Sequence, residues 1–311
     1  MSGLVKVCAV HFWPGFSLEH GFVRLLLDHA LDSFQIVDSE KEADIVLTSI
    51  FPSYPRIRKN LHLKWPAFPQ KSIGVVWENE RPDYSKYKFS LSSDFDSYGG
   101  RNCRVPLWYM QLQWPGMKPD LPPPGSKAWS LFEPLVDVES LLHPRDSSTV
   151  PDRERFCCFV AKNAERHRMF AIDCLNAVAP VDLYGPISGK TARMSKYEIL
   201  KDYRFNLCFE NSSFPGYYTE KLLQAWVGGC VPLYFSDPWF HIDFNPRAAI
   251  NRIDFATVGD FAGHVASINS SRNAMKDLYD QPLLTKRPSL DGAIKFLKDA
   301  CADILTANRK Q

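Results

Sequence analysis

Short apolar runs alternate with amphipathic stretches along the 311-residue chain. In the first half, the apolar runs predict strands at residues 5–10, 44–50, 72–77 and 87–91. Between the first two runs, residues 21–31 repeat apolar side chains at helical spacing and predict an amphipathic helix. Because the runs are apolar almost throughout, they suit a parallel sheet that is covered on both faces.

The second half of the chain repeats this design. The predicted strands lie at residues 155–160, 181–184, 205–209 and 230–235. The predicted helices lie near residues 169–178, 195–203, 219–228, 258–268 and 290–305. Strands and helices that alternate in this way form βαβ units. The pattern therefore predicts an α/β fold with two Rossmann-like domains that face each other across a cleft.

A proline-rich stretch separates the two halves. Residues 114–151 include the run LPPPG at 121–125 and lack helical or strand periodicity. Proline removes a backbone donor and fixes φ, so this stretch is expected to be an irregular connector. We place the first domain at residues 1–152, with the connector at its end, and the second at residues 153–311. The last helix, near residues 290–305, could return to pack on the first domain.

Composition narrows the class of protein. The chain has 37 Lys and Arg against 35 Asp and Glu, and 45% of its residues are hydrophobic. That balance excludes a disordered chain, which needs low hydrophobicity and high net charge. A protein that binds nucleic acid would carry a basic patch or stripe, so no nucleic-acid partner is expected.

The eight cysteines and the amino terminus indicate the compartment. Buried structural thiols of a reducing compartment are expected at the cysteines inside apolar runs, which are Cys8, Cys157, Cys158, Cys208 and Cys230. The amino terminus lacks the charged and apolar regions of a signal peptide, and no window approaches the ~18 apolar residues of a transmembrane helix. A soluble chain is expected, although a catalytic fragment of a membrane-anchored protein would look the same.

Two short segments are similar to phosphate or metal signatures. Residues 185–191 follow a strand as a P-loop does, but the glycines are one residue too close and Pro186 removes one cradling N–H. Asp94 and Asp96 form a DxD of the kind that holds Mn²⁺ or Mg²⁺ on a nucleotide diphosphate, or else they are ordinary turn residues. The histidines show no spacing typical of metal ligands.

The densest polar cluster in an apolar context lies at residues 205–221. A strand leads into the sequence ENSS at 210–213, then into a turn, and then into a helix whose expected N-cap is Thr219. Loops at the carboxyl ends of parallel strands are where open α/β sheets bind ligands. Lys221 would reinforce the preference of the helix amino terminus for an anion, and Glu220 would accept from sugar hydroxyls. The alternative is a solvated surface pair.

The segment WENERP at residues 77–82 closes an apolar strand of the first domain. A glutamate at the carboxyl end of such a strand would project toward the cleft, where it could serve as a general base. The alternative is an ordinary turn with its charges in water.

These segments resemble the signature of the α-1,3/4-fucosyltransferases, glycosyltransferase family 10. Residues 205–221 match every fixed position of a motif that reads FxLxFENSxxxxYxTEK. Residues 77–82 resemble the ENESP-type segment of that family. Further resemblances are RVPLWY at 104–109, FVAKN at 159–163, VPLYF at 231–235 and FNP at 244–246, and together they span residues 5–284 in order.

The resemblance implies a GT-B architecture, with an acceptor-binding first domain and a GDP-fucose-binding second domain. It implies transfer of L-fucose from GDP-β-L-fucose, with inversion, to the 3-hydroxyl of N-acetylglucosamine or glucose in an oligosaccharide acceptor. By motif position, Glu80 is the general base, and Arg168 and Lys221 bind the pyrophosphate, with Arg166 as the alternative to Arg168. Contacts to the nucleotide or to fucose are expected from Asn211, Tyr217 and Glu220.

Electrostatics adds an expectation about cofactors. Two fixed cations and a helix amino terminus can stabilise the charge that grows on GDP, so a divalent metal is not expected to be essential. Arg81 replaces a small residue of the family pattern, and it would lower the pKa of Glu80 if it points inward. Acceptor choice is expected to depend on loops such as 51–69, whose aromatic side chains could stack on sugar rings or pack on the domain.

Departures from the family bear on localisation. The chain lacks the heptad repeats, basic tail and amino-terminal anchor of other members. The expected form is a bacterial-type cytoplasmic enzyme with at most peripheral membrane association, and a catalytic fragment of a Golgi membrane enzyme is the alternative. Two rival functions stay open, which are use of another GDP-sugar and a glycan- or nucleotide-binding protein without turnover.

Overall fold

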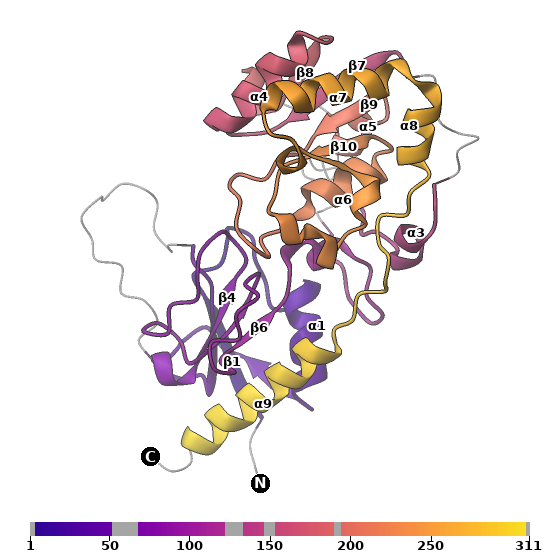
Figure 1. Cartoon of the computed structure of the whole chain (residues 1–311). Coiled ribbons are helices and arrows are strands. Elements are labelled where there is room, and N and C mark those ends of the chain that lie inside the picture. The colour runs from indigo at the N-terminus through magenta and orange to yellow at the C-terminus, as the bar shows by residue number, and fades with distance from the viewer. Residues whose placement is uncertain (1–3, 52–67, 122–132, 146–152, 190–193, 309–311) are drawn as a thin grey trace. The chain divides into compact units, whose positions relative to one another are not determined.

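A computed structural model describes residues 4–51, 68–121, 133–145, 153–189 and 194–308 of the chain (Figure 1). Contacts divide the chain into two compact units. Unit 1 comprises residues 1–110, 114–120 and 289–311, and unit 2 comprises residues 111–113 and 121–288. This division differs from a boundary at residues 152 and 153, because the proline-rich stretch from residue 121 groups with unit 2 and the last helix groups with unit 1.

Unit 1 is built on a six-stranded sheet in the order β2-β1-β3-β4-β5-β6, and every pairing is parallel. The strands are β1 (Val5–Val10), β2 (Phe34–Ile36), β3 (Ile45–Thr48), β4 (Ser72–Val76), β5 (Phe89–Ser92) and β6 (Asn102–Arg104). Helix α1 (Gly21–Ala30) packs against the last helix, α9 (Asp291–Asn308). Buried Leu297 and Ile304 lie on the core face of α9, which explains why this helix belongs to unit 1.

Unit 2 is built on a five-stranded parallel sheet in the order β11-β10-β9-β7-β8. The strands are β7 (Arg155–Val160), β8 (Val181–Tyr184), β9 (Tyr203–Leu207), β10 (Val231–Tyr234) and β11 (Ile250–Asn251). The helices are α3 (Val138–Leu142), α4 (Arg166–Asn176), α5 (Lys196–Leu200), α6 (Glu220–Val227), α7 (Val258–Ser270) and α8 (Arg272–Tyr279). The two parallel sheets confirm the expected pair of Rossmann-like domains, the components of a GT-B architecture.

Each sheet has one point at which the strand order reverses. In unit 1 the chain runs from β1 to β2 on one side and then to β3 on the other, so the reversal lies between β1 and β3. In unit 2 it lies between β7 and β9 for the same reason. Ligands of open α/β sheets bind outside the carboxyl ends of the strands at such points. The topology therefore marks one candidate edge in each unit.

Part of the expected connector is fixed to unit 2 by a half-buried arginine. Arg145 donates hydrogen bonds to the carbonyl oxygens of Trp226, Cys230 and Tyr279 at 2.9–3.0 Å. Its guanidinium also lies over the Tyr279 ring, 3.7 Å from the centroid. These contacts satisfy backbone acceptors that burial would otherwise leave unpaired, so this arginine fixes the segment before β7 to unit 2.

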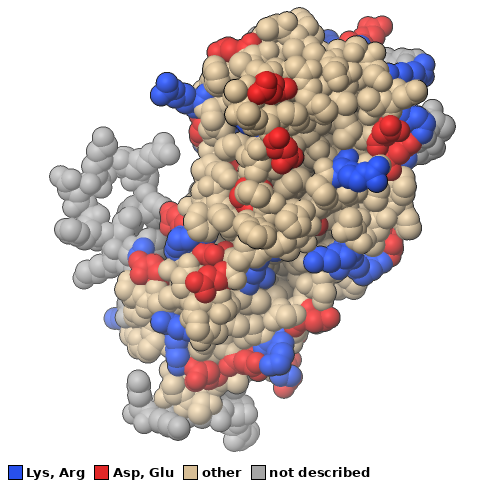
Figure 2. Space-filling view, viewed as in Figure 1, with Lys and Arg blue, Asp and Glu red and all other residues tan. Residues whose placement is uncertain are grey.

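The cysteines and the surface charges match the expectations from composition. All eight cysteines are free thiols, and burial raises the pKa of Cys157, Cys158 and Cys208. Figure 2 shows Lys and Arg side chains interspersed with Asp and Glu on the face in view, without a continuous basic patch. Within the described ranges, no helix is both long and apolar enough to cross a membrane.

Candidate functional site

A cavity of about 250 Å³ lies in unit 2 at the carboxyl ends of β7 and β9, where the strand order reverses. Its floor is formed by residues of these two strands and the loops that follow them. Its polar lining carries four cations together with two amides and one carboxylate, which are Lys162, Arg168, Lys196, Lys221, Asn163, Asn211 and Glu220. A cavity with this lining is suited to a ligand that carries several negative charges.

Arg168 reaches the cavity from the first turn of α4. Its side chain is buried, and Nη2 donates to the Phe209 carbonyl oxygen and to Asn211 Oδ1, each at 2.6 Å. Burial lowers the pKa of this guanidinium, an effect that the carboxylate of Glu165 opposes from 3.9 Å. Its buried Nε has no acceptor among the described residues. By contrast, Arg166 is exposed and is not among the residues that line this cavity.

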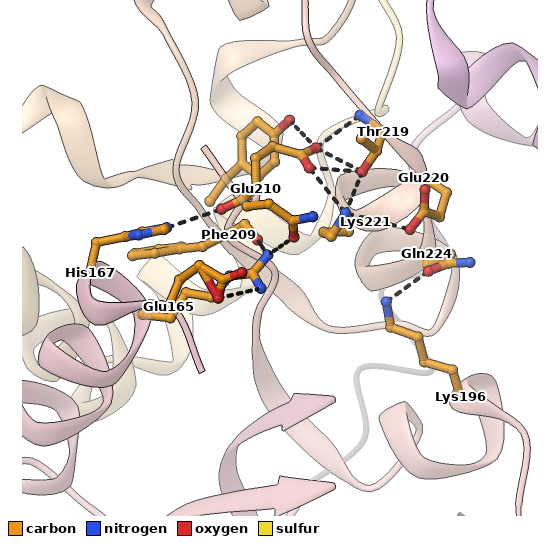
Figure 3. A network of polar contacts seen from close by, with 12 residues as sticks. Glu165, His167, Lys196, Phe209, Glu210, Thr219, Glu220, Lys221 and Gln224 are labelled. Carbon is orange, nitrogen blue, oxygen red and sulfur yellow. Dashed lines mark hydrogen bonds and ion pairs between the residues drawn. The ribbon is translucent and has the colours of Figure 1, made fainter. Parts of the chain in front are cut away.

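Glu210 follows β9 and is completely buried at the centre of a polar network (Figure 3). Its Oε1 accepts from the Thr219 N–H at 2.8 Å, the Thr219 hydroxyl at 2.9 Å and the Tyr234 hydroxyl at 2.9 Å. Its Oε2 accepts from Lys221 Nζ at 3.1 Å. The Glu210 carbonyl oxygen in turn lies 3.0 Å from Nε2 of His167. The network thus joins β9, β10, α4 and the start of α6.

Lys221 and Glu220 occupy the first turn of α6, as their motif predicts. Lys221 Nζ donates to Thr219 Oγ1 at 2.8 Å and lies 3.6 Å from Glu220 Oε1. Burial alone would lower the pKa of Lys221, but the carboxylates of Glu210 and Glu220 outweigh it and raise that pKa. Burial alone would raise the pKa of Glu220, but the charges of Lys221 and Lys196 outweigh it and lower that pKa. The two residues form an ion pair, but they are only partly exposed and line a cavity, unlike a fully solvated surface pair.

Lys196 is a cation of this cavity that the sequence reasoning missed. It begins α5 directly after the N-cap residue Ser195, which forms a capping box with Glu198. Its Nζ donates to Gln224 Oε1 at 2.7 Å, and Gln224 Nε2 donates to a carboxylate oxygen of Glu133. The capping box is visible in the sequence, but the position of Lys196 beside α6 depends on how the helices pack.

Tyr217 was expected to contact the nucleotide or fucose. Its side chain is 2% exposed and is not among the residues that line the cavity. The glycine-rich segment that follows β8 also has a different structure from a P-loop. Residues Pro186–Ser188 form a short 3₁₀ helix between Gly185 and Gly189, both with positive φ, and Lys190 and Thr191 lie outside the described residues.

In unit 1, Glu80 lies in the turn that follows β4, with its side chain exposed. Its N–H donates to the Glu78 carbonyl oxygen at 2.7 Å. The neighbouring Arg81 directs its guanidinium to Asp94, with Nη1 3.0 Å from Oδ2, and to Asn79 Oδ1 at 2.8 Å. The guanidinium of Arg81 thus forms an ion pair with Asp94. The expectation from the sequence concerned its effect on Glu80.

The DxD segment forms a hydrogen-bonded turn. Asp94 is buried and accepts from the Tyr98 hydroxyl at 2.7 Å and from the Asp96 N–H at 3.2 Å. Asp96 accepts from the Tyr98 N–H at 2.8 Å. Over the part of the chain that the structure describes, no three His, Cys, Asp or Glu side chains gather in a group that could hold a metal. These contacts match the turn alternative, in which short carboxylates bond nearby backbone N–H groups.

The reversal point of the unit 1 sheet is lined with aromatic side chains. His11 follows β1 with φ of 60°, and its Nδ1 lies 3.2 Å from Thr48 Oγ1 at the end of β3. Burial lowers the pKa of His11. The Trp13 ring lies 5.0 Å from Phe16 and 6.3 Å from Trp77, centroid to centroid. Positive φ at a non-glycine residue often marks a functional site. Of the acceptor loop expected at residues 51–69, residues 52–67 lie outside the described residues.

Comparison with known families identifies the unit that contains the cavity. Residues 150–281 match the model described as glycosyltransferase family 10 (fucosyltransferase), C-terminal. The cavity described above lies within these matched residues, and so do Arg168, Asn211, Glu220 and Lys221.

Known proteins similar to the chain include fucosyltransferases. The α-(1,3)-fucosyltransferase FucT of Helicobacter pylori is 29% identical over 243 residues, which is 74% of this chain and 50% of the relative. The α-(1,3)-fucosyltransferase 7 of Mus musculus is 30% identical over 149 residues, which is 46% of this chain and 38% of the relative. The chain thus spans half or less of the length of these relatives. A crystal structure of an α1,3-fucosyltransferase with GDP-fucose is similar in fold, with a TM-score of 0.69 and 23% identity over 97% of this chain and 90% of that one.

Proposed function

We propose that the chain is an α-1,3-fucosyltransferase. It transfers L-fucose from GDP-β-L-fucose, with inversion at the anomeric carbon, to the 3-hydroxyl of N-acetylglucosamine or glucose in an oligosaccharide. The observation that carries this proposal is the cation-lined cavity within the residues that match family 10, located where an open α/β sheet binds ligands. The similar proteins support the donor, because they are fucosyltransferases and one of them was crystallised with GDP-fucose.

In this proposal the cavity holds GDP, and the cations act on its pyrophosphate. Arg168 is fixed by two hydrogen bonds, and Lys221 is held by the network around Glu210. Charge grows on the diphosphate as the glycosidic bond breaks, and cations that are already fixed stabilise it without reorganisation. Glu220 accepts from hydroxyls of the donor, and Asn211, which orients Arg168, contacts the nucleotide or fucose. The burial of Tyr217 favours an indirect role for that residue.

Glu80 is the proposed general base. An inverting transfer needs a group that takes the proton of the acceptor hydroxyl on the face opposite the leaving group. Glu80 is an exposed carboxylate at the carboxyl end of β4, the edge at which a Rossmann-like unit presents its functional groups. The neighbouring Arg81 forms an ion pair with Asp94.

The acceptor is proposed to bind unit 1 near the reversal point of its sheet. Trp13 and Phe16 offer aromatic surface of the kind on which sugar rings stack, and Trp77 connects this cluster to the segment that carries Glu80. His11 and Thr48 supply polar groups beside it for hydroxyl recognition.

The proposed reaction needs no metal, because Arg168, Lys196 and Lys221 supply the positive charge. Activity is expected to be unchanged when EDTA is added to the purified protein. Loss of activity with EDTA and its recovery with Mn²⁺ would overturn this expectation and return Asp94 and Asp96 to consideration as metal ligands.

The test of the proposed function is turnover of GDP-fucose on an array of oligosaccharides that contain N-acetylglucosamine or glucose. We expect fucose on the 3-hydroxyl with α configuration, measured by mass spectrometry and NMR of the product. GDP-mannose serves as the competing donor. Preferential use of GDP-mannose would overturn the donor assignment, and GDP binding without transfer to any acceptor would favour a binding protein.

A further inference from the structure

The buried carboxylate of Glu210 has no part in the reaction proposed above, yet more hydrogen bonds converge on it than on the cavity residues around it. It accepts from Thr219, Tyr234 and Lys221, and none of its surface is exposed. A buried carboxylate is costly unless such partners satisfy it. The donors satisfy both oxygens of the carboxylate.

The start of α6 depends on this carboxylate. Thr219 occupies the N-cap position, but its side chain makes no capping hydrogen bond to the helix. Instead, its hydroxyl donates to Glu210, and its N–H donates to the same carboxylate at 2.8 Å. A negative charge at a helix amino terminus is favourable, and free N–H groups there need acceptors. The end of β9 therefore fixes the first turn of α6 through Glu210.

The same carboxylate fixes the direction of a cavity cation. Lys221 Nζ is held between Glu210 Oε2 at 3.1 Å and Thr219 Oγ1 at 2.8 Å, while its side chain lines the cavity (Figure 3). A lysine side chain has four flexible torsions, so a free ammonium would lose much of its entropy on binding a ligand. The contacts of Lys221 with Glu210 and Thr219 restrict the ammonium before any ligand arrives.

We propose that Glu210 is a positioning residue, which holds the first turn of α6 and aims the ammonium of Lys221 at the diphosphate of the donor. This role rests on the proposed function, because it assumes a diphosphate in the cavity.

A carboxylate fits this role better than an amide. The Thr219 N–H and the Lys221 ammonium can only donate, so Glu210 needs acceptor capacity on both oxygens. A glutamine has one oxygen and places an NH₂ group where the second carboxylate oxygen stands. In Glu210→Gln, either the helix start or the lysine loses its partner.

The experiment measures binding of GDP and of guanosine by calorimetry to the whole chain and to Glu210→Gln. We expect GDP affinity to fall by at least about tenfold, as loss of a hydrogen bond to a charged group implies. Guanosine, which lacks phosphates, should bind both proteins equally. Asp237→Asn is the matched control, because Asp237 is also a buried carboxylate of unit 2, bonded to Tyr218 and Trp239 outside this cavity. It should keep the affinity for GDP.

A double-mutant cycle separates positioning from a general loss of stability. In the Lys221→Met background, Glu210→Gln should add little further loss of GDP affinity, because the residue through which it acts is gone. Additive losses, or unchanged GDP affinity in Glu210→Gln, would refute the role.

A second variant covers the case in which Glu210→Gln does not fold. Thr219→Val keeps the carboxylate but removes the hydroxyl that bridges it to Lys221, and we expect at least about threefold weaker GDP binding. Equal affinity in this folded variant would also contradict the proposal. If the unaltered chain binds no GDP, the proposed function itself fails, and the role of Glu210 falls with it.

Discussion

The cations of the cavity in unit 2 are held in place by hydrogen bonds within the protein. Arg168 is bonded to the Phe209 carbonyl oxygen and to Asn211, and Lys221 is bonded to Glu210 and Thr219. The carboxylates of Glu210 and Glu220 raise the pKa of Lys221 against the effect of burial. Fixed charges of this kind stabilise a developing anion more effectively than side chains that must first reorganise.

Loss of a cavity cation should therefore reduce turnover strongly. We expect Lys221→Ala to lower kcat/KM for GDP-fucose by about 10²-fold or more. Removal of one group that stabilises the charge of a transition state typically reduces the rate by about that factor. Arg166→Ala is the control, because this arginine is exposed and does not line the cavity. Initial rates with a fixed acceptor provide the measurement, and equal losses in both variants would contradict the assignment of Lys221.

Removal of the proposed base should separate binding from chemistry. Glu80→Gln preserves size and hydrogen bonding but cannot accept a proton, so kcat should fall by about 10²- to 10⁴-fold. GDP affinity, measured by calorimetry, should stay unchanged because Glu80 belongs to unit 1 and the cavity to unit 2. Glu78→Gln, in the same turn, is the matched control. A variant at Glu80 with the rate of the unaltered chain would exclude this residue as the base.

At the scale of elements, the sequence predicts the strands and helix starts that a local pattern of residues determines. Strands such as β4 and β10 were found from their apolar runs, and the position of Lys221 in the first turn of α6 followed from helix signals. The three-residue strands β2 and β6 were missed, because so short a run carries no periodicity. The predicted helix at 195–203 is shorter in the structure, where α5 ends at Leu200.

The contacts between elements could not be predicted. Arg168 meets Phe209 across 41 residues, and Lys196 meets Gln224 across 28 residues. Such contacts depend on the order of the strands in the sheet, which a single sequence does not encode in any local pattern. The same applies to Thr219, whose N-cap position was correct but whose hydroxyl bonds to Glu210.

The loop between β1 and α1 should govern acceptor binding. We expect Trp13→Ala to raise KM for the oligosaccharide by about fivefold, since an aromatic contact is worth about 1 kcal/mol beyond its buried area. KM for GDP-fucose should stay the same, because the donor cavity lies in unit 2. Trp239→Ala, which removes an exposed tryptophan of unit 2, is the control. A matching rise in both KM values would point to a general loss of structure.

At the scale of the whole molecule, the chain passes from unit 1 to unit 2 and returns. Unit 1 takes its first strands from the beginning of the chain and α9 from residues beyond 288. The structure therefore assigns the last helix to a unit whose other elements precede unit 2 in the sequence. Long-range contacts of this kind add loop-closure entropy to the cost of completing unit 1.

Weakening α9 should destabilise unit 1 selectively. Ile304 is completely buried, so Ile304→Ala should lower the free energy of unfolding of unit 1 by about 2–5 kcal/mol. Lys298→Ala, on the exposed face of the same helix, is the control and should have little effect. Calorimetric scans with and without GDP identify the transition that belongs to unit 2, because ligand binding raises its midpoint. An equal shift of the GDP-dependent transition in Ile304→Ala would contradict this division.

Because α9 packs in unit 1, the order in which the two units complete their folding during synthesis differs from their order along the chain. The strands of unit 1 emerge from the ribosome first, but the helix that packs on α1 is translated only after the whole of unit 2. Unit 2 is contiguous from residue 121 to residue 288, and it can therefore close its sheet while unit 1 still lacks one of its covering helices. The half of the protein that is made first is thus the half that finishes folding last.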